Sequence, residues 1–109
     1  MSTNSAIEAL KKEQARVQTV FEQARKDYVD KRNLMDTFTH EEFEVLCQKM
    51  LSPSSLEKTA HLQEERKREV RKHLCLEILR KTYEEANFQR RAIAECIEKI
   101  EIYQKAYEL

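Results

Sequence analysis

The chain has no glycine and a single proline, Pro53, among its 109 residues. Glycine supplies the positive φ angles of tight hairpin turns, so its absence argues against a β-rich fold. Its absence also removes the dinucleotide-binding and nucleoside-triphosphate-binding fingerprints, because both need glycine at fixed positions. The sequence therefore predicts neither a phosphate-cradling loop nor a nucleotide cofactor.

An excess of charge of either sign is also lacking, since 20 Lys and Arg residues balance 20 Asp and Glu residues. A neutral chain has no overall field that would attract nucleic acid or an anionic membrane. No stretch approaches the roughly 20 apolar residues of a membrane span, and the first residues lack the apolar run of a signal peptide. We expect no nucleic-acid partner and no membrane span.

The three cysteines are an odd number in a chain without a secretory signal, and they fit reduced thiols better than a disulfide framework. Cys75 and Cys96 lie too far apart along one predicted helix to pair with each other. Cys47 and Cys96 fit as small buried hydrophobic residues. We expect the chain in a reducing, intracellular compartment, the cytoplasm, with a cytoskeletal location as the narrower alternative.

What the chain does contain is the composition and spacing of long helices that lie half in water. Charged residues make up 37% and apolar residues 40% of it, and the regular spacing of the apolar residues argues against disorder. A capping box, in which a Ser or Thr and a Glu three residues later each accept a backbone N–H, opens three segments. These pairs are Ser5 with Glu8, Thr39 with Glu42, and Ser54 with Glu57. They predict helices that begin near residues 5, 39 and 54.

The first segment carries a heptad seam, in which residues recur in alternating steps of three and four. The seam positions are Ile7, Leu10, Gln14, Val17, Phe21, Ala24, Tyr28, Lys31 and Met35. Its two strongly polar members, Gln14 and Lys31, either fix register or partner choice or mark a seam that frays into solvent. A helix over about 5–36 follows from this pattern.

The second segment, 39–51, is short and amphipathic. One face of it carries Phe43, Leu46, Cys47 and Met50. A helix of this length is marginal by itself, so its stability has to come from packing. The joint before it, 36–38, contains neither glycine nor proline, so a turn and a bend in one longer helix both remain open.

The third segment, about 54–108, contains no helix breaker and predicts one long helix. A heptad seam runs through its second half at Leu76, Leu79, Tyr83, Ala86, Arg90, Ile93, Ile97, Ile100, Gln104 and Tyr107. A second apolar stripe lies on a neighbouring face at Val70, Leu74, Ile78, Phe88, Ala92 and Cys96. A helix with two apolar stripes usually contacts two other surfaces.

Together these segments predict an all-α fold, an elongated helical hairpin of the coiled-coil type. Its first arm is broken into a long and a short helix, about 5–36 and 39–51, and its second arm is one long helix, about 54–108. Folding the first two helices back antiparallel along the third uses most of both seams. We expect a single domain over residues 1–109.

No constellation typical of catalysis or metal binding stands out. The candidate metal ligands, histidines and cysteines, show neither CxxC nor HxxxH spacing. Adjacent carboxylates such as Glu41 and Glu42 lie in solvated, charged surroundings, without the burial that general acid or base catalysis would need. A nucleophilic Ser or Cys needs a shaped loop, and this chain has almost none. We expect no enzyme activity, no catalytic residue, no metal, no cofactor and no small-molecule substrate.

The sharpest local charge feature is a cationic cluster in the third segment. It consists of Arg66, Lys67, Arg68, Arg71 and Lys72. At about 100° per residue these cations surround the helix instead of forming the single basic stripe of a nucleic-acid groove. The cluster is either a solvated helix surface with pairs such as Glu64 and Arg68, or a docking point for an acidic protein surface.

We predict a non-enzymatic scaffold protein that holds other proteins, or a second copy of itself, through coiled-coil helices, as a subunit of a larger assembly. Antiparallel pairing of two arms covers one stripe of the third helix and leaves the other exposed. The alternative is that the short second helix covers this stripe internally near Val70 to Ile78, which would still leave Phe88 and Ala92 bare. The predicted partner-binding residues are therefore Val70, Leu74, Ile78, Phe88 and Ala92. The alternative is a cytoskeletal protein, for example an axonemal one, that docks along a filament or microtubule through the cationic cluster.

Overall fold

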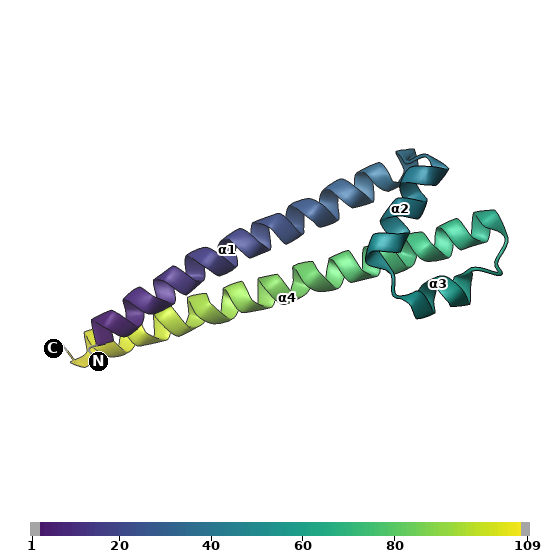
Figure 1. Cartoon of the computed structure of the whole chain (residues 1–109). Helices are drawn as coiled ribbons and strands as arrows, with labels where there is room; N and C mark the ends of the chain where they lie inside the picture. Colours follow the sequence, from purple (N-terminus) through teal and green to yellow (C-terminus); the bar gives the residue numbers. More distant parts are fainter. Residues whose placement is uncertain (1–2, 108–109) are drawn as a thin grey trace. The chain divides into compact units, whose positions relative to one another are not determined.

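A computed structural model describes residues 3–107 of the chain. Within this range 92% of the residues are helical and none lies in a strand. The elements in order are α1 (Thr3–Leu34), the 3-10 helix η1 (Met35–Thr37), α2 (His40–Met50), α3 (Pro53–Thr59) and α4 (Glu64–Tyr107) (Figure 1). The predicted all-α class is confirmed, as is a helical hairpin with a long first arm and a long last helix.

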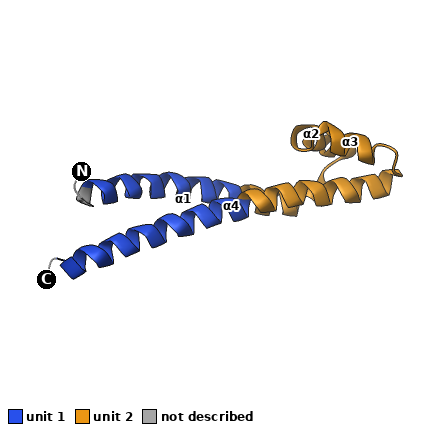
Figure 2. Ribbon diagram, turned by 90° about the horizontal axis from the view of Figure 1, so that it is seen from below, with its two compact units in different colours: residues 1–25, 83–109 blue, residues 26–82 orange. Residues whose placement is uncertain are grey.

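The contacts within the chain cluster into two compact units (Figure 2). Unit 1 combines residues 1–25 with residues 83–109, and unit 2 comprises residues 26–82. The expectation of one domain over 1–109 stays a prediction, because α1 and α4 each contribute to both units.

Unit 1 is an antiparallel pair formed by the first part of α1 and the last part of α4. Near the start of α1, Lys11 Nζ lies 3.7 Å from Glu101 Oε1 near the end of α4. Further along α1, the ring of Phe21 stacks on that of Tyr83, which comes earlier in α4, with ring centroids 5.5 Å apart. The two helices therefore run antiparallel. Phe21 and its neighbours on both helices form a small buried cluster. Among its described residues this unit is a two-helix coiled coil, without a third helix to cover the outer sides of α1 and α4.

The predicted heptad seams are the buried sides of the two long helices. Every member of the first seam, from Ile7 to Met35, is buried or half-buried, and so is every member of the second from Leu76 to Gln104. Tyr107, the last predicted member, is exposed. The predicted polar insertions Gln14 and Lys31 are half-buried.

Unit 2 contains a second core, in which α2 and α3 pack on the first part of α4. The buried members of this core are Met35, Phe43, Cys47, Leu51 and Cys75. The predicted capping box of α2 is present, because Glu42 N–H donates to Thr39 Oγ1 and Thr39 N–H donates to Glu42 Oε1, both at 3.2 Å. The joint before α2 is a turn, since η1 is followed by extended backbone at Phe38.

The prediction of one unbroken helix over 54–108 is wrong. The chain forms α3 and α4 with a turn at 60–63 between them. In the turn, the N–H groups of Ala60 and Leu62 donate to carbonyls three residues earlier, at 3.2 and 3.1 Å. Tightening the last turn in this way ends an α-helix without glycine or proline.

Two of the three predicted capping boxes are also wrong. The N-cap of α3 is Ser52, whose Oγ accepts from Ser55 N–H at 3.2 Å, and Pro53 takes the first helical position, where its missing N–H costs nothing. Ser54 therefore lies inside α3. Ser5 lies inside α1, which already runs from Thr3.

Candidate functional site

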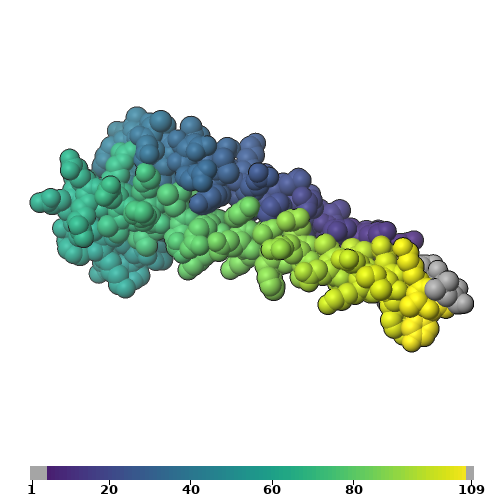
Figure 3. Space-filling model, turned by 180° about the vertical axis from the view of Figure 1, so that it is seen from behind, coloured from purple at the N-terminus to yellow at the C-terminus, as the bar shows by residue number. Residues whose placement is uncertain are grey.

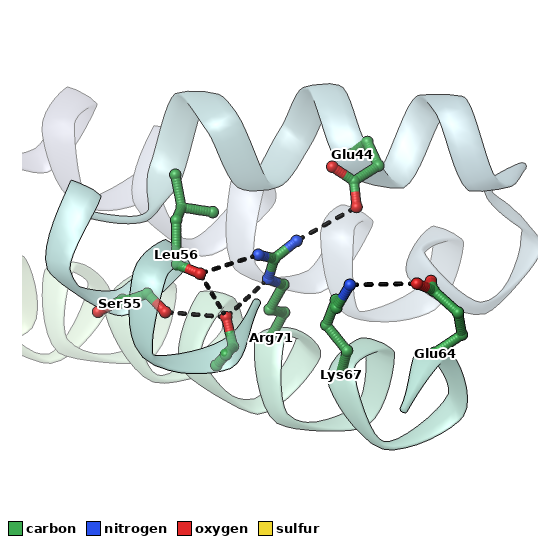
Figure 4. Close-up of polar contacts among 7 residues, drawn as sticks. Glu44, Ser55, Leu56, Glu64, Lys67 and Arg71 are labelled. Atoms are coloured by element: carbon green, nitrogen blue, oxygen red, sulfur yellow. Dashed lines mark hydrogen bonds and ion pairs between the residues drawn. The ribbon is translucent and has the colours of Figure 1, made fainter. Parts of the chain in front are cut away.

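The predicted cationic cluster lies at the start of α4, where unit 2 has its core. Arg71 is only 6% exposed. Its Nε donates to Thr59 Oγ1 at 2.8 Å, its Nη2 to the carbonyl of Leu56 at 3.1 Å, and its Nη1 to Glu44 Oε1 at 3.2 Å (Figure 4). One guanidinium thus joins α2, α3 and α4.

Three further cations of the cluster have partners inside unit 2. Arg68 donates from Nη2 to the carbonyl of Phe38 at 2.7 Å and stacks over the ring of Phe43. Lys72 pairs with Asp36 at 2.5 Å. Lys67 pairs with Glu64 at 3.1 Å, and this bond lowers the pKa of the Glu64 carboxyl from its ordinary value (Figure 4).

Arg66 is the one member of the cluster that is exposed. The predicted pair of Glu64 with Arg68 is replaced by that of Glu64 with Lys67. Most of the cluster therefore holds unit 2 together. Docking to an acidic surface stays a prediction, and most of the cations that it would use are already bonded within unit 2.

A pocket of about 220 Å³ lies beside this cluster. It is lined by His40, Phe43, Glu44, Glu64, Glu65, Lys67, Arg68 and Arg71. Ligand pockets usually have volumes of about 300 to 1,000 Å³ and an apolar lining with a few polar groups. This one is smaller and is lined by three carboxylates and three cations, several of which already pair with each other, so it has no strong net charge to offer a ligand.

The burial of the three cysteines differs from the prediction. Cys47 and Cys75 are fully buried next to each other in the core of unit 2, whereas Cys96, expected to be buried, is exposed. Burial, together with the neighbouring Cys47 thiol, raises the pKa of Cys75 to about 12, and burial also raises the pKa of Cys47. Both thiols are therefore protonated near neutral pH, which makes them poor nucleophiles and poor metal ligands.

The predicted partner stripe is only partly exposed. Val70 and Leu74 are half-buried, and Leu74 packs on the core of unit 2. Ile78 is 40% exposed, Phe88 is 75% exposed and Ala92 is exposed. The first part of the stripe, Val70 and Leu74, thus belongs to the fold, whereas Ile78, Phe88 and Ala92 are exposed to solvent.

Phe88 lies on α4 outside the seam with α1. Its neighbours two residues earlier and later, Ala86 and Arg90, lie on the seam, and Arg90 stacks over the ring of Phe21 on α1. Two steps of about 100° each place Phe88 outside that seam. In the space-filling view, α4 of unit 1, coloured green to yellow, presents a side that no other described part of this unit covers (Figure 3).

Two shallow grooves flank the Phe88 ring. One, of about 460 Å³, is lined by α4 residues that include Glu84, Arg91 and Ala92. The other, of about 320 Å³, reaches across to α1 at Glu13 and Val17. An exposed aromatic ring between two grooves is the geometry of an anchor residue with room beside it for a partner side chain.

Sequence reasoning missed a second exposed apolar group near the end of α4. Ile102, Tyr103 and Tyr107 are all more than half exposed, and the rings of Tyr103 and Tyr107 lie 4.6 Å apart. Tyr103 and Tyr107 are four residues apart on a helix, and this spacing was the signal that would have shown a common exposed surface.

The described part of the chain, residues 3–107, holds no group of three or more His, Cys, Asp or Glu side chains placed to bind a metal ion. Across the same residues, every helix is too short or too polar to cross a membrane.

Comparison with protein-family models, with curated proteins and with solved structures gives no significant match to this chain.

Proposed function

We propose that this protein is a non-enzymatic helical scaffold, a subunit that associates with other protein helices through the outward face of α4. The observation that carries the proposal is Phe88, a large apolar ring that is 75% exposed on α4 outside its seam with α1. Contiguous exposed apolar surface usually marks a site of protein association, and the exposed Ala92 lies one turn after Phe88.

The surroundings of Phe88 support the proposal. Ala92, one turn later, leaves space beside the ring, and charged residues such as Glu84 and Arg91 border it. A central aromatic anchor with a polar rim is the usual composition of a protein–protein interface. Because the site is one helix face, the natural partner is another helix packed along it.

The reduced state that fits three free cysteines supports a cytoplasmic place for this scaffold. Docking along an acidic cytoskeletal polymer has less support. It would use the cationic cluster, but Arg68, Arg71 and Lys72 are already bonded inside unit 2.

The test is a double variant, Ile78→Gln with Phe88→Gln, which removes the two most apolar exposed residues of the stripe. Glutamine is a good helix former, so circular dichroism should show unchanged helicity. The variant should lose the association that the wild-type chain shows in sedimentation, whether with itself or with a partner isolated from its source. Val20→Gln, at another exposed apolar residue on α1, is the matched control and should associate like the wild type.

Loss of helicity in the double variant with association unchanged would mean that the stripe belongs to the core, and the proposal would be wrong.

A further inference from the structure

The charged residues on the outward face of α4 are arranged with opposite signs about Phe88. Three residues before it lies Glu85 and three residues after it lies Arg91. Seven residues before it lies Lys81 and seven residues after it lies Glu95. At each of these distances, one side of Phe88 carries the charge opposite to that on the other side.

The pattern continues one turn further and is confined to one face. Eleven residues before Phe88 lies Glu77, and eleven residues after it lies Lys99. Steps of seven and eleven residues are close to whole numbers of turns at about 3.6 residues per turn, and a step of three residues stops about 60° short of one turn. These side chains therefore lie on or beside the face of Phe88. All of them except Glu77, which is half-exposed and pairs with Arg80, are exposed.

An antiparallel second helix reads this pattern in reverse. If two copies of α4 cross with the two Phe88 residues opposite each other, each residue before Phe88 in one copy faces the residue equally far after it in the other. Glu85 then faces Arg91 of the second copy, and Lys81 faces its Glu95. A parallel crossing at Phe88 would instead place each charge against its own like, which is unfavourable.

We propose that the partner on this face is a second copy of this chain, whose α4 packs antiparallel with the two Phe88 rings in contact at a twofold axis. This inference rests on the association proposed above and identifies the partner helix as α4 of a second copy. Charge complementarity favours a copy over an unrelated helix, because a twofold interface has to be complementary to itself and this face is.

The surface near Phe88 accommodates such a contact. The groove between Phe88 and Ala92 measures about 460 Å³ and gives the ring of the second copy a place beside the first. At the same time Ala92, four residues after Phe88, faces Glu84 of the second copy, so the small side chain meets the stem of a long one. One helix face is a small interface, and we expect a weak, concentration-dependent dimer.

Two charge reversals test the pairing at residues outside the core of unit 1. Glu85 and Arg91 are both exposed on unit 1. Glu85→Arg places an arginine against Arg91 twice in the dimer, and Arg91→Glu places a glutamate against Glu85 twice. In sedimentation experiments from about 10 μM to about 1 mM, the range of a weak complex, each variant alone should dimerise with a dissociation constant raised roughly tenfold or more.

The decisive measurement is an equimolar mixture of the two variants. In a mixed dimer, the arginine introduced at position 85 of one copy faces the glutamate introduced at position 91 of the other. The second pair keeps Glu85 against Arg91, so every contact is again attractive. The mixture should dimerise with close to the wild-type dissociation constant, and native mass spectrometry should find one copy of each variant in the dimer. Lys12→Glu, an exposed residue on α1, makes the same change of charge as Arg91→Glu and should leave wild-type dimerisation unchanged.

Three results would each overturn the proposal: a wild-type chain that stays monomeric up to about 1 mM, single variants that dimerise like the wild type, or a mixture that fails to recover dimerisation. A monomeric wild-type chain whose complex with a different partner is lost in the Ile78→Gln, Phe88→Gln variant would overturn the second-copy proposal alone and leave the proposed scaffold function standing.

Discussion

Arg71 offers the most direct test of what holds unit 2 together. Arg71→Met keeps an unbranched stem of similar length and removes only the guanidinium. It removes the Arg71 donor from the Leu56 carbonyl, the Thr59 hydroxyl and the Glu44 carboxylate, at 3.1, 2.8 and 3.2 Å. The Leu56 carbonyl keeps a second donor, Thr59 Oγ1, at 3.2 Å. Breaking a buried pair by removing one partner costs about 3–5 kcal/mol.

The lower end of that range applies here. The side chain of Glu44 is 36% exposed, so water can solvate it once the guanidinium is gone. Thr59 also keeps its own bond to the carbonyl of Ser55 at 2.8 Å. We expect Arg71→Met to destabilise unit 2 by about 3 kcal/mol. Arg71→Lys keeps the positive charge but lacks the planar guanidinium with its several N–H donors, so it should recover only part of the lost stability.

Hydrogen exchange measures this loss where it occurs. The amides of α3 and of the turn at 60–63 should exchange roughly a hundredfold faster in Arg71→Met, because that segment opens more easily. Arg66→Met is the matched control from the same cluster, since Arg66 is exposed, and its effect should stay within about 0.5 kcal/mol. Equal protection of α3 in wild type and Arg71→Met would refute the assignment of Arg71 to the fold. Equal stability combined with weaker partner binding would revive the docking hypothesis instead.

Four further measurements probe the rest of the chain. Phe21→Ala should lower the free energy of unfolding by about 3 kcal/mol, because the ring is only 9% exposed and packs in the small core of unit 1; an unchanged melting temperature would contradict the antiparallel pairing. Arg90→Leu should raise the free energy of unfolding by about 1 kcal/mol, since the buried Nε of Arg90 has no hydrogen-bond partner within residues 3–107. A drop in the thermal midpoint would show that stacking on Phe21 and the bond from Arg90 Nη2 to Asn87 Oδ1, at 2.8 Å, outweigh that cost. A thiol reagent at about pH 8 should modify Cys96 quickly and leave Cys47 and Cys75 unmodified until the protein unfolds, and rapid reaction of all three would contradict the buried pair. The free energy of unfolding should fall as the pH rises from 9.0, where the Cys75 thiol ionises in the unfolded chain, to about 12, its pKa in the folded chain. The fall should be smaller in Cys75→Ala. An equal fall in the wild type and in Cys75→Ala would show that other groups cause it.

The hairpin and its seams were predictable because they are encoded locally. Steps of three and four residues place Val17 and Phe21 on one side of α1 and Ala86 and Ile97 on one side of α4, and all four are buried. Such a pattern needs no knowledge of what lies opposite, because the spacing of the apolar residues itself marks the side of each long helix that is covered. For the same reason Phe88, outside the seam, was correctly expected to face solvent.

The break between α3 and α4 was not predictable because its cause is not local. Residues 60–63 contain no glycine or proline, and nothing in their side chains forbids a helix. Shortening the last bonds of α3 frees the carbonyl of Leu56 from its usual partner four residues on, Ala60, whose N–H bonds Glu57 instead. The guanidinium of Arg71, 15 residues away in sequence, donates to that carbonyl and so stabilises the break.

The cationic cluster and the face of Phe88 differ in whether their charged side chains have partners within the chain. Cations placed all around a helix must meet whatever packs on it, and Arg68, Arg71 and Lys72 meet a carbonyl, a hydroxyl and carboxylates of unit 2. On the outward face of unit 1 no further described helix of that unit approaches, so Glu85 and Arg91 keep their charge in water beside an exposed aromatic ring. Charges that are dispersed around a helix and bonded internally stabilise the fold, whereas charges of ordered sign around an exposed apolar centre are free to select a partner. It is this order, and not the larger number of cations at the start of α4, that makes the face of Phe88 the better candidate for recognition.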